Sequence, residues 1–470
     1  MVFSSLEFLF WFLTVTLLLY YAVPRKYLKL RNLVLFITSL AFYGWSEPKL
    51  LFLMIFTIAI DYLGGMLIGR YESDRKKQKL VLVLTVVINL GILAFFKYYN
   101  FLYRIVSLAV KLPESFNLNI SLPVGISFYT FQSLSYVIDV YRKDARVQKD
   151  PIAFGTYVTL FPQLVAGPIV RYHDVDMMLT ERHENVSQFA DGIRRFIVGL
   201  GKKVLLSNMV AALFESFKAI PNENRTVLAA WMCVISYTLH IYFDFSGYSD
   251  MAIGLGKMFG FDFLENFNYP YIAKSIKDFW DRWHISLSTW FREYLYYPLG
   301  GNRCSKFRHI FNLFVVWFAT GLWHGANFNY VLWGIYYFLL LTIEKYCLKN
   351  VLDKLPSFVR RIYTMFFVII GWLIFSFEDM SVGAGWFKNL FGFGTVGFAS
   401  RTDLFDLLRN LPFFIILIIG CTPIPKRIYE RLNGKRFFKA AFVLLGMAVL
   451  AVSVVYLVSS SFNPFIYFIF

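Results

Sequence analysis

A histidine inside a largely apolar, aromatic stretch is the first residue of this sequence with clear chemical potential. His324 lies in "FATGLWHGANF", Phe318 to Phe328, between Gly321 and Gly325. Imidazole is the side chain that can act as a general base near neutral pH, and glycine lets a ligand approach the backbone closely. The stretch therefore predicts either a general base in a buried site or a hydrogen-bonded packing residue.

A second histidine, His284, lies in "IKDFWDRWHISLSTWFREYLYYPLGGNR", Ile276 to Arg303. Large apolar residues recur there at helical spacing, and polar residues lie opposite: Phe279, Trp283, Leu287, Trp290 and Tyr294 against Asp281, His284, Ser288 and Arg292. The pattern predicts one amphipathic helix in the cytoplasmic interface of a membrane, ended by Pro298 and two glycines. A surface anchor would explain the tryptophans and arginines, but it would not explain His284 or Asp281.

A third polar group lies in "YTLHIYFDFSGYSDMAIGLGKMFG", Tyr237 to Gly260. Helical spacing puts four of its polar residues on one face: Tyr242, Ser246, Ser249 and Asp250. A carboxylate in a bilayer costs about 2.5–3.5 kcal/mol, so Asp244 and Asp250 should face protein or a cavity. They predict either a functional site or a packing network in which Gly247 and Gly254 allow close helix contact.

The remaining histidines and the cysteines predict no further site. His240 is expected to pack in a membrane crossing, and His173, His183 and His309 are expected to be solvated in polar or basic loops. The four cysteines lack the spacing of a metal site or a disulfide framework, so no metal is predicted. Motifs of serine hydrolases, P-loop NTPases and zinc proteases are missing from the sequence.

The composition is that of an integral membrane protein. Of the 470 residues, 58% are hydrophobic and only 16% are charged, and the mean hydropathy is +0.55, so a soluble core could not bury the apolar surface. No stretch is polar enough for a separate soluble domain, and one membrane domain spanning residues 1–470 is predicted. The first apolar segment lacks the basic start of a signal peptide and is expected to be a retained helix.

The net charge of +17 reflects topology, because the basic residues gather in alternate loops. Nucleic acid is therefore not expected as a partner. Placing the basic loops in the cytoplasm predicts about twelve crossings with both termini outside. The segment Phe154 to Arg171, broken by prolines and a glycine, would spoil this parity as a full crossing and is expected to be re-entrant.

Several ordered motifs resemble the membrane-bound O-acyltransferase family, specifically its bacterial branch typified by the membrane subunit of alginate O-acetylation. They are "MVFSS", "FYGW", "LPVGISFYTFQSLSYVIDVYR", "FPQLVAGPIVR", "YFDFSGYSDMAIGLG", "ENFNYPY", "FWDRWHISLSTWFREYLYYPLGGNR" and "GLWHGANF". The likeness thins after Glu344, and Asp281, His240 and Tyr337 depart from the usual residues.

The resemblance implies an all-α polytopic fold, with transmembrane, re-entrant and interfacial helices around a central funnel. His324 corresponds to the histidine regarded as catalytic, and His284 to the second family histidine. Donor-binding or funnel-lining roles are expected for a larger set: Arg282, Asp281, Ser288, Trp323, Asp244, Ser246, Asp250 and Asn266. No permanently bound cofactor is expected, and the implied donor is a cytoplasmic thioester such as acetyl-coenzyme A.

The implied reaction is O-acetylation of an extracytoplasmic polysaccharide, with the acyl group carried across the inner, or plasma, membrane. Membrane lipid and an extracytoplasmic acetyltransferase are the implied partners. His324 would accept the proton of the attacking hydroxyl, a role worth about 10²–10⁴-fold in rate. The alternatives are D-alanyl transfer to teichoic acid, a polysaccharide transporter, and a scaffold in which His324 is dispensable.

Overall fold

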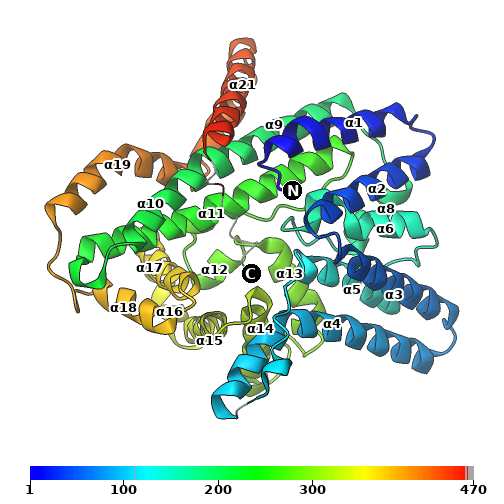
Figure 1. Cartoon of the computed structure of the whole chain (residues 1–470), viewed down its shortest axis with the longest axis horizontal. Coiled ribbons are helices and arrows are strands. Elements are labelled where there is room, and N and C mark those ends of the chain that lie inside the picture. The colour runs from blue at the N-terminus through cyan, green and yellow to red at the C-terminus, as the bar shows by residue number, and fades with distance from the viewer. Residues whose placement is uncertain (111, 461–462, 464–470) are drawn as a thin grey trace. The chain divides into compact units, whose positions relative to one another are not determined.

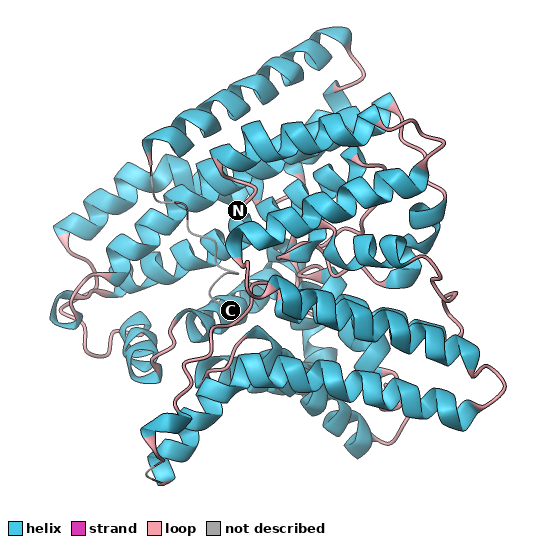
Figure 2. Ribbon diagram, turned by 45° about the vertical axis from the view of Figure 1, so that its right-hand side comes forward, coloured by secondary structure: helices cyan, strands magenta, loops and turns pink. Residues whose placement is uncertain are grey.

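The computed structural model describes residues 1–110, 112–460 and 463, and these residues form helices joined by loops (Figures 1 and 2). Within them, extended backbone pairs only at an isolated antiparallel bridge between Phe267 and Trp283. The predicted all-α fold is confirmed. The C-terminal end, predicted to lie on the extracytoplasmic side, includes residues 461–462 and 464–470, which fall beyond the described part of the chain.

Seven segments among the described residues are long and apolar enough to cross a membrane. An eighth is obtained if two helices bent by 69° are taken as one span. The segments are Leu51–Arg70, Arg75–Ala109, Val186–Lys218, Val227–Met258, Phe328–Leu352, Ser357–Ser376 and Arg436–Ser459, with the bent pair Arg401–Gly420 and Ile424–Leu432. The expected count of twelve is therefore not confirmed, because helices such as Ile126–Arg142 are shorter and carry buried polar residues.

The chain falls into two compact units, of which the first comprises Met1–Phe196 and Tyr248–Leu264. Within it, α3, α4 and α5 pack against one another, as α2 and α6 do (Figure 1). It contains the following helices and the first part of α9: α1 (Leu13–Ala22), α2 (Leu28–Ser46), α3 (Leu51–Arg70), α4 (Arg75–Ala109), α5 (Ile126–Arg142), α6 (Pro151–Thr159), α7 (Phe161–Leu164), α8 (Tyr172–Thr180) and α9 (Val186–Gly201).

The second unit comprises Ile197–Gly247 and Glu265–Phe470. Within it, α14 packs along α15, and α15 packs against α17. Its helices are α10 (Asn208–Lys218), α11 (Val227–Met258, except its end), α12 (Ile276–Trp280), α13 (Ile285–Phe291), α14 (Lys306–His324), α15 (Phe328–Ile343), α16 (Lys349–Leu352), α17 (Ser357–Ser376), α18 (Met380–Leu390), α19 (Arg401–Gly420), α20 (Ile424–Leu432) and α21 (Arg436–Ser459).

The segment expected to be re-entrant is broken, as its sequence predicts. Helix α6 ends at Thr159, Pro162 lies in the first turn of the short helix α7, and the chain from Val165 to Arg171 is not helical. Every residue from 153 to 172 is buried. Irregular backbone is tolerated at membrane depth only when protein or a wet cavity surrounds it, so this burial meets the requirement for a re-entrant segment.

Candidate active site

His324 is the last residue of α14. The helix begins after Ser305, whose Oγ accepts a hydrogen bond from the backbone N–H of Arg308 at 3.4 Å, and it ends where Gly325 becomes extended. The His324 side chain is buried. Its ring meets Trp333 of α15 and Phe375 of α17 nearly at right angles, with centroids 5.0 and 5.3 Å apart. Three helices of the second unit therefore enclose this imidazole.

His284 lies at the turn between α12 and α13. Its φ of +46° is in the left-handed region, which is uncommon for a residue other than glycine and costs about 1–3 kcal/mol. The conformation is held by a short ladder in which Asn268 N–H donates to the Arg282 carbonyl and Ile285 N–H to the Asn266 carbonyl, both at 3.0 Å. The surrounding structure thus fixes an unfavourable backbone at a candidate catalytic residue.

The side chain of Asn266 fixes the imidazole of His284. Asn266 Oδ1 accepts from the backbone N–H of Ser286 at 3.2 Å and from its hydroxyl at 2.9 Å. Because a backbone N–H can only donate, the oxygen of the amide must face this way. His284 Nδ1 lies 3.1 Å from the same oxygen and therefore carries a proton. The neutral ring then presents Nε2 as its acceptor.

The two histidines meet at one indole. The centroid of the Trp323 ring lies 5.9 Å from that of His284 and 5.0 Å from that of His324. Burial, followed by the charge of His324, lowers the pKa of His284 well below its usual value, so His284 is neutral near neutral pH. The second unit therefore brings both predicted histidines and Trp323 to one buried aromatic site.

The glycines beside His324 do not open space for a ligand, which corrects the expectation from the sequence. A Cβ at Gly321 would lie 2.5 Å from the carbonyl oxygen of Tyr330, and a Cβ at Gly325 would overlap the Tyr330 ring. Gly334 similarly lies against the Trp317 carbonyl. Small residues let helix backbones approach closely, so these glycines bring α14 and α15 together.

The single amphipathic helix predicted over Ile276–Arg303 is wrong. Helix α12 ends at Trp280, a turn follows, and α13 starts at Ile285. Most of the aromatic stripe is buried in protein instead of facing lipid, including Phe279, Trp283 and Trp290. The periodicity was produced by side chains packing in a core, and the break at His284 follows from its left-handed backbone.

The charged residues of this segment are partly exposed and paired. Arg282 Nε lies 2.7 Å from Asp278 Oδ1, and Asp281 pairs with Lys277 at 2.5 Å and with Arg292 at 3.7 Å. Ser288, half-buried, donates to the Trp280 carbonyl at 3.4 Å. These side chains therefore form a polar rim on the segment that carries the buried His284.

The sequence profile of the membrane-bound O-acyltransferase family matches residues 6–384, most of the chain and all of the segments just described. The chain belongs to this family. It is an O-acyltransferase of the membrane, and the resemblance noted in its motifs is confirmed.

Three relatives show the range of this O-acyltransferase family. The chain is 44% identical to the probable alginate O-acetylase AlgI of Pseudomonas aeruginosa, over 84% of this chain and 76% of that protein. It is 29% identical to the peptidoglycan O-acetyltransferase of Helicobacter pylori, over 100% and 97% of the two chains. It is also 29% identical to the teichoic acid D-alanyltransferase of Bacillus subtilis, but over only 54% and 68%.

The two aspartates predicted on α11 of this O-acyltransferase each lie in an ion pair. In the second unit, Asp244 is fully buried and its Oδ1 lies 2.5 Å from Lys203 Nζ. Ser207 donates to Asp244 at 3.3 Å and contacts His240 Nδ1 at 3.0 Å. In the first unit, Asp250 lies 2.8 Å from Arg195.

Ser246 of the predicted α11 set is buried. The expected close helix contact is confirmed, because a Cβ at Gly247 would lie 2.9 Å from the Gly199 carbonyl and one at Gly254 would lie 2.7 Å from that of Gly192. The sequence does not indicate Lys203 and Arg195 as partners, because they lie 41 and 55 residues from Asp244 and Asp250.

His309 was expected to be solvated, and this expectation is wrong. It is buried in the first turn of α14, where its Nε2 and Nδ1 lie 2.9 and 2.8 Å from the hydroxyls of Tyr296 and Tyr346. The basic residues around His309 are typical of a loop, but α14 already begins at Lys306. His183 is exposed as predicted.

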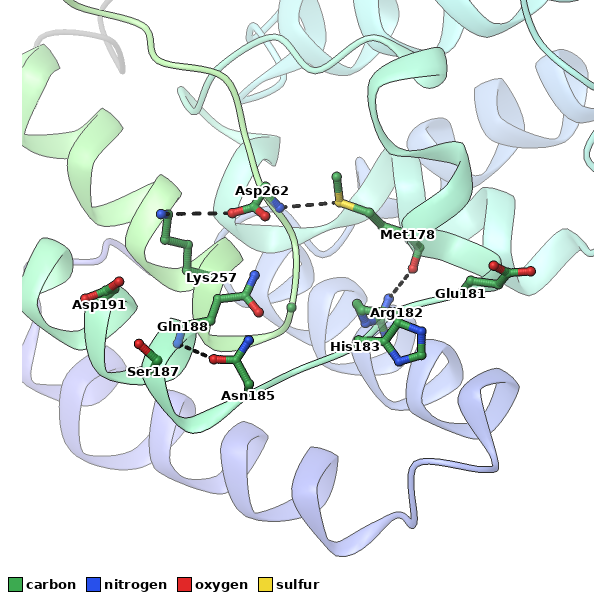
Figure 3. A pocket seen from close by; sticks show the side chains of 11 residues that line it. Met178, Glu181, Arg182, His183, Asn185, Ser187, Gln188, Asp191, Lys257 and Asp262 are labelled. Atoms are coloured by element: carbon green, nitrogen blue, oxygen red, sulfur yellow. Dashed lines mark hydrogen bonds and ion pairs between the residues drawn. The ribbon is translucent and has the colours of Figure 1, made fainter.

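A polar cavity of about 580 Å³ lies in the first unit (Figure 3). Its lining includes Lys257 and Asp262, which are 4.0 Å apart, and Arg182, which donates to the Met178 carbonyl at 3.2 Å. None of the predicted site residues lines it. No group of three or more histidine, cysteine or acidic side chains in the described part of the chain could hold a metal ion.

Proposed function

We propose that this O-acyltransferase takes an acetyl group from a cytoplasmic thioester, acetyl-coenzyme A, and passes it across the membrane for O-acetylation of an extracytoplasmic polysaccharide. The relatives that match most of the chain are O-acetylating enzymes by name. The observation that carries the proposal is the meeting of two buried histidines at Trp323 in the second unit.

His324 is the general base in this proposal. Its ring is buried among aromatic side chains, where water would compete poorly with a hydroxyl for the acyl group. The hydroxyl oxygen attacks the thioester carbonyl, and a C–O bond forms as the C–S bond breaks. The hydroxyl proton passes to His324 and then to the leaving thiolate, so the base is regenerated.

The donor is held at the polar rim beside His284. Arg282, Arg292 and Lys277 are each at least partly exposed and lie close together in the sequence. Arginine and lysine bind phosphate through charge-assisted hydrogen bonds, which suits the phosphates of coenzyme A. Asp281 and Ser288 would then set the positions of these cations and of the pantetheine arm.

The direction of transfer follows from the predicted topology. Basic loops mark the cytoplasmic side, and the donor rim belongs to one of them, Lys274 to Arg308. The protein is placed in the inner, or plasma, membrane with both termini outside. A secreted or anchored acetyltransferase on the far side would receive the acetyl group and modify the polysaccharide.

D-Alanyl transfer to teichoic acid is the second candidate. The related D-alanyltransferase matches only 54% of this chain, whereas the O-acetylating relatives match 84% and 100%. This difference in coverage favours acetyl as the transferred group. A neighbouring gene for a D-alanine carrier protein would favour the alternative.

The test replaces the proposed base and measures polymer-bound acetate in producing cells. His324→Gln keeps approximate shape but cannot take a proton near neutral pH, so acetylation should fall about 10²-fold or more. Membrane abundance of the variant should remain near that of the wild type. A stable His324→Gln protein that acetylates normally would assign the ring to packing.

The matched control is His240→Gln. His240 is also a buried histidine of the second unit, and a glutamine can still bond to Ser207. This control should retain acetylation. If both variants lost acetylation equally, the loss in His324→Gln would not be specific to the proposed base.

A further inference from the structure

The side-chain amide of Asn266 uses its oxygen, Oδ1, in hydrogen bonds, whereas its nitrogen, Nδ2, makes none to a described residue. Its side chain is fully buried, and Oδ1 accepts the hydrogen bonds from Ser286 and His284 described above. Its Nδ2 is buried as well but makes no hydrogen bond to any residue that the structure describes. Leaving a buried donor unsatisfied is costly, so this N–H group requires a further partner.

The position of this amide indicates what that partner is. The three donors on Oδ1 fix the amide plane, and thus also the direction of Nδ2, next to His284. Asparagine amides in other enzymes donate to the oxygen that gains negative charge during acyl transfer, and removing one such donor costs about 10²–10³-fold in rate. A fixed donor of this kind needs no rearrangement when the charge develops.

We propose that Asn266 is a catalytic residue that donates a hydrogen bond from Nδ2 to the carbonyl oxygen of the acyl donor. This inference rests on the proposed function and adds a role for a residue that the sequence placed only along the funnel or donor site. As the hydroxyl oxygen attacks, the carbonyl oxygen becomes negative and Asn266 stabilises it. The oxygen releases that charge when the C–S bond breaks.

The same side chain has a second effect, on His284. By accepting from Nδ1–H, Asn266 keeps Nε2 of the neutral ring as an acceptor. His284 therefore cannot supply a hydrogen bond to the carbonyl oxygen from Nε2 while it is neutral. This division of roles leaves Asn266 as the donor and His284 as an acceptor toward the bound substrates.

Asn266→Asp separates the two effects. An aspartate can still accept from His284 and Ser286, but it has no N–H group to donate. It also places a negative charge beside His284, which raises the pKa of that histidine. His284 then becomes neutral only at higher pH, so the rate of transfer should rise at higher pH than in the wild type. We expect the plateau of transfer at high pH to stay about 10²-fold below that of the wild type.

The measurement is transfer of radiolabelled acetyl from acetyl-coenzyme A to polymer in membranes of producing cells, followed against pH. Recovery of the wild-type plateau at high pH would overturn the donor role, because only the protonation of His284 would then have changed. Asn268→Asp is the matched control. It makes the same change two residues away at an exposed side chain, and it should retain at least half of the wild-type plateau.

A spectroscopic measurement tests Asn266 without relying on transfer. Solid-state NMR of the whole protein labelled at its histidine ring nitrogens, with His284 assigned by its loss in His284→Gln, reports which nitrogen carries the proton. We expect a protonated Nδ1 in the wild type and a loss of this preference in Asn266→Ala. An unchanged Nδ1 signal in Asn266→Ala would overturn the contact on which the inference stands.

The two proposals can fail separately. If wild-type membranes transfer no acetyl from acetyl-coenzyme A, the proposed donor is wrong, whereas the NMR result for His284 stands by itself. If the wild type is active and His324→Gln is not, but Asn266→Asp reaches the normal plateau, only the role of Asn266 is overturned.

Discussion

Two buried polar sites, one in each unit, use opposite kinds of surroundings. In the first unit, Glu184 is enclosed by charges: Arg31 Nη1 lies 2.8 Å from it, Arg182 Nε 3.7 Å, and the Tyr20 hydroxyl donates to it. In the second unit, the ring of His324 is packed against Trp323, Trp333 and Phe375.

The difference predicts that the first site stabilises the fold and that the second takes part in transfer. Paired charges in the first unit satisfy one another, and removing one member leaves the rest buried without compensation. An imidazole among aromatic rings can exchange a proton without breaking an ion pair. Substitutions in the first site should therefore change the amount of folded protein, whereas substitutions at His324 should change the rate of transfer.

The largest expected effect on stability is that of Glu184→Gln. Glutamine has no charge to balance the two buried arginines, and breaking a buried ion pair in this way costs about 3–5 kcal/mol. Membrane abundance and the midpoint of thermal unfolding in detergent should both fall strongly. Glu181→Gln, the same change at an exposed residue three positions earlier, should leave both near the wild-type values.

Acid should reproduce part of this effect. Burial raises the pKa of Glu184, but the hydrogen bond from Tyr20 and the charge of Arg31 lower it by more, so its pKa lies below the usual value. The stability that ionised Glu184 contributes is present above the unfolded pKa of about 4.3 and is lost as pH falls through the lower folded pKa.

A Glu184→Gln protein with normal abundance but no transfer would contradict the assignment of stability to the first site and transfer to the second.

An intermediate effect is expected at Gly325, where the amount of folded protein and the rate of transfer should change together. An added methyl group would overlap the Tyr330 ring, and overpacking of this kind costs about 1–3 kcal/mol. Because Gly325 follows His324 directly, Gly325→Ala should lower both abundance and acetylation per molecule. Gly446→Ala, where a Cβ would meet nothing within 4 Å and alanine favours the helix, should lower neither.

The smallest effect is expected at His173 in the first unit. The hydrogen bond to Asp139, at 2.8 Å, outweighs burial and raises the pKa of His173. Its contribution is full below the unfolded pKa of about 6.5 and is lost as pH rises through the higher folded pKa. The wild type should therefore gain stability when the pH is lowered from neutral. His173→Gln should gain about 0.5–1 kcal/mol less.

Exposed His183 provides the comparison for this pH effect. His183→Gln removes an exposed imidazole of the same unit and shows what the loss of a histidine ring does without the contact to Asp139. An equal change in both variants would mean that the contact with Asp139 does not stabilise the fold.

Features set by local composition were predictable from the sequence. The helical class, the break near Pro162 and the close contacts at Gly247 and Gly254 follow from hydropathy, backbone restriction and residue size. His284 and His324 were identified by family motifs, and the structure brings them to one indole. Periodicity failed at Trp283, because a stripe of aromatic residues fits a buried turn as well as a lipid-facing helix.

Features that depend on chain segments far apart could not be read in this way. Lys203 lies 41 residues from Asp244, and nothing in the local pattern links them. The glycines beside His324 looked like open space because the ring that fills it, Tyr330, belongs to the next helix. The left-handed backbone of His284 likewise depends on backbone hydrogen bonds with Asn266 and Asn268, which lie in the loop before α12.

The length of α4 has a consequence for the lipid around the first unit. Its 35 residues extend about 52 Å at 1.5 Å per residue, well beyond the hydrocarbon thickness of about 30 Å. The helix must tilt or project into water, and a mismatch of this size makes bilayer thickness part of its energetics. Packing against α3 and α5 fixes the inclination of α4 within the first unit, so lipids of different chain length should change the free-energy cost of the mismatch and with it the stability of this unit.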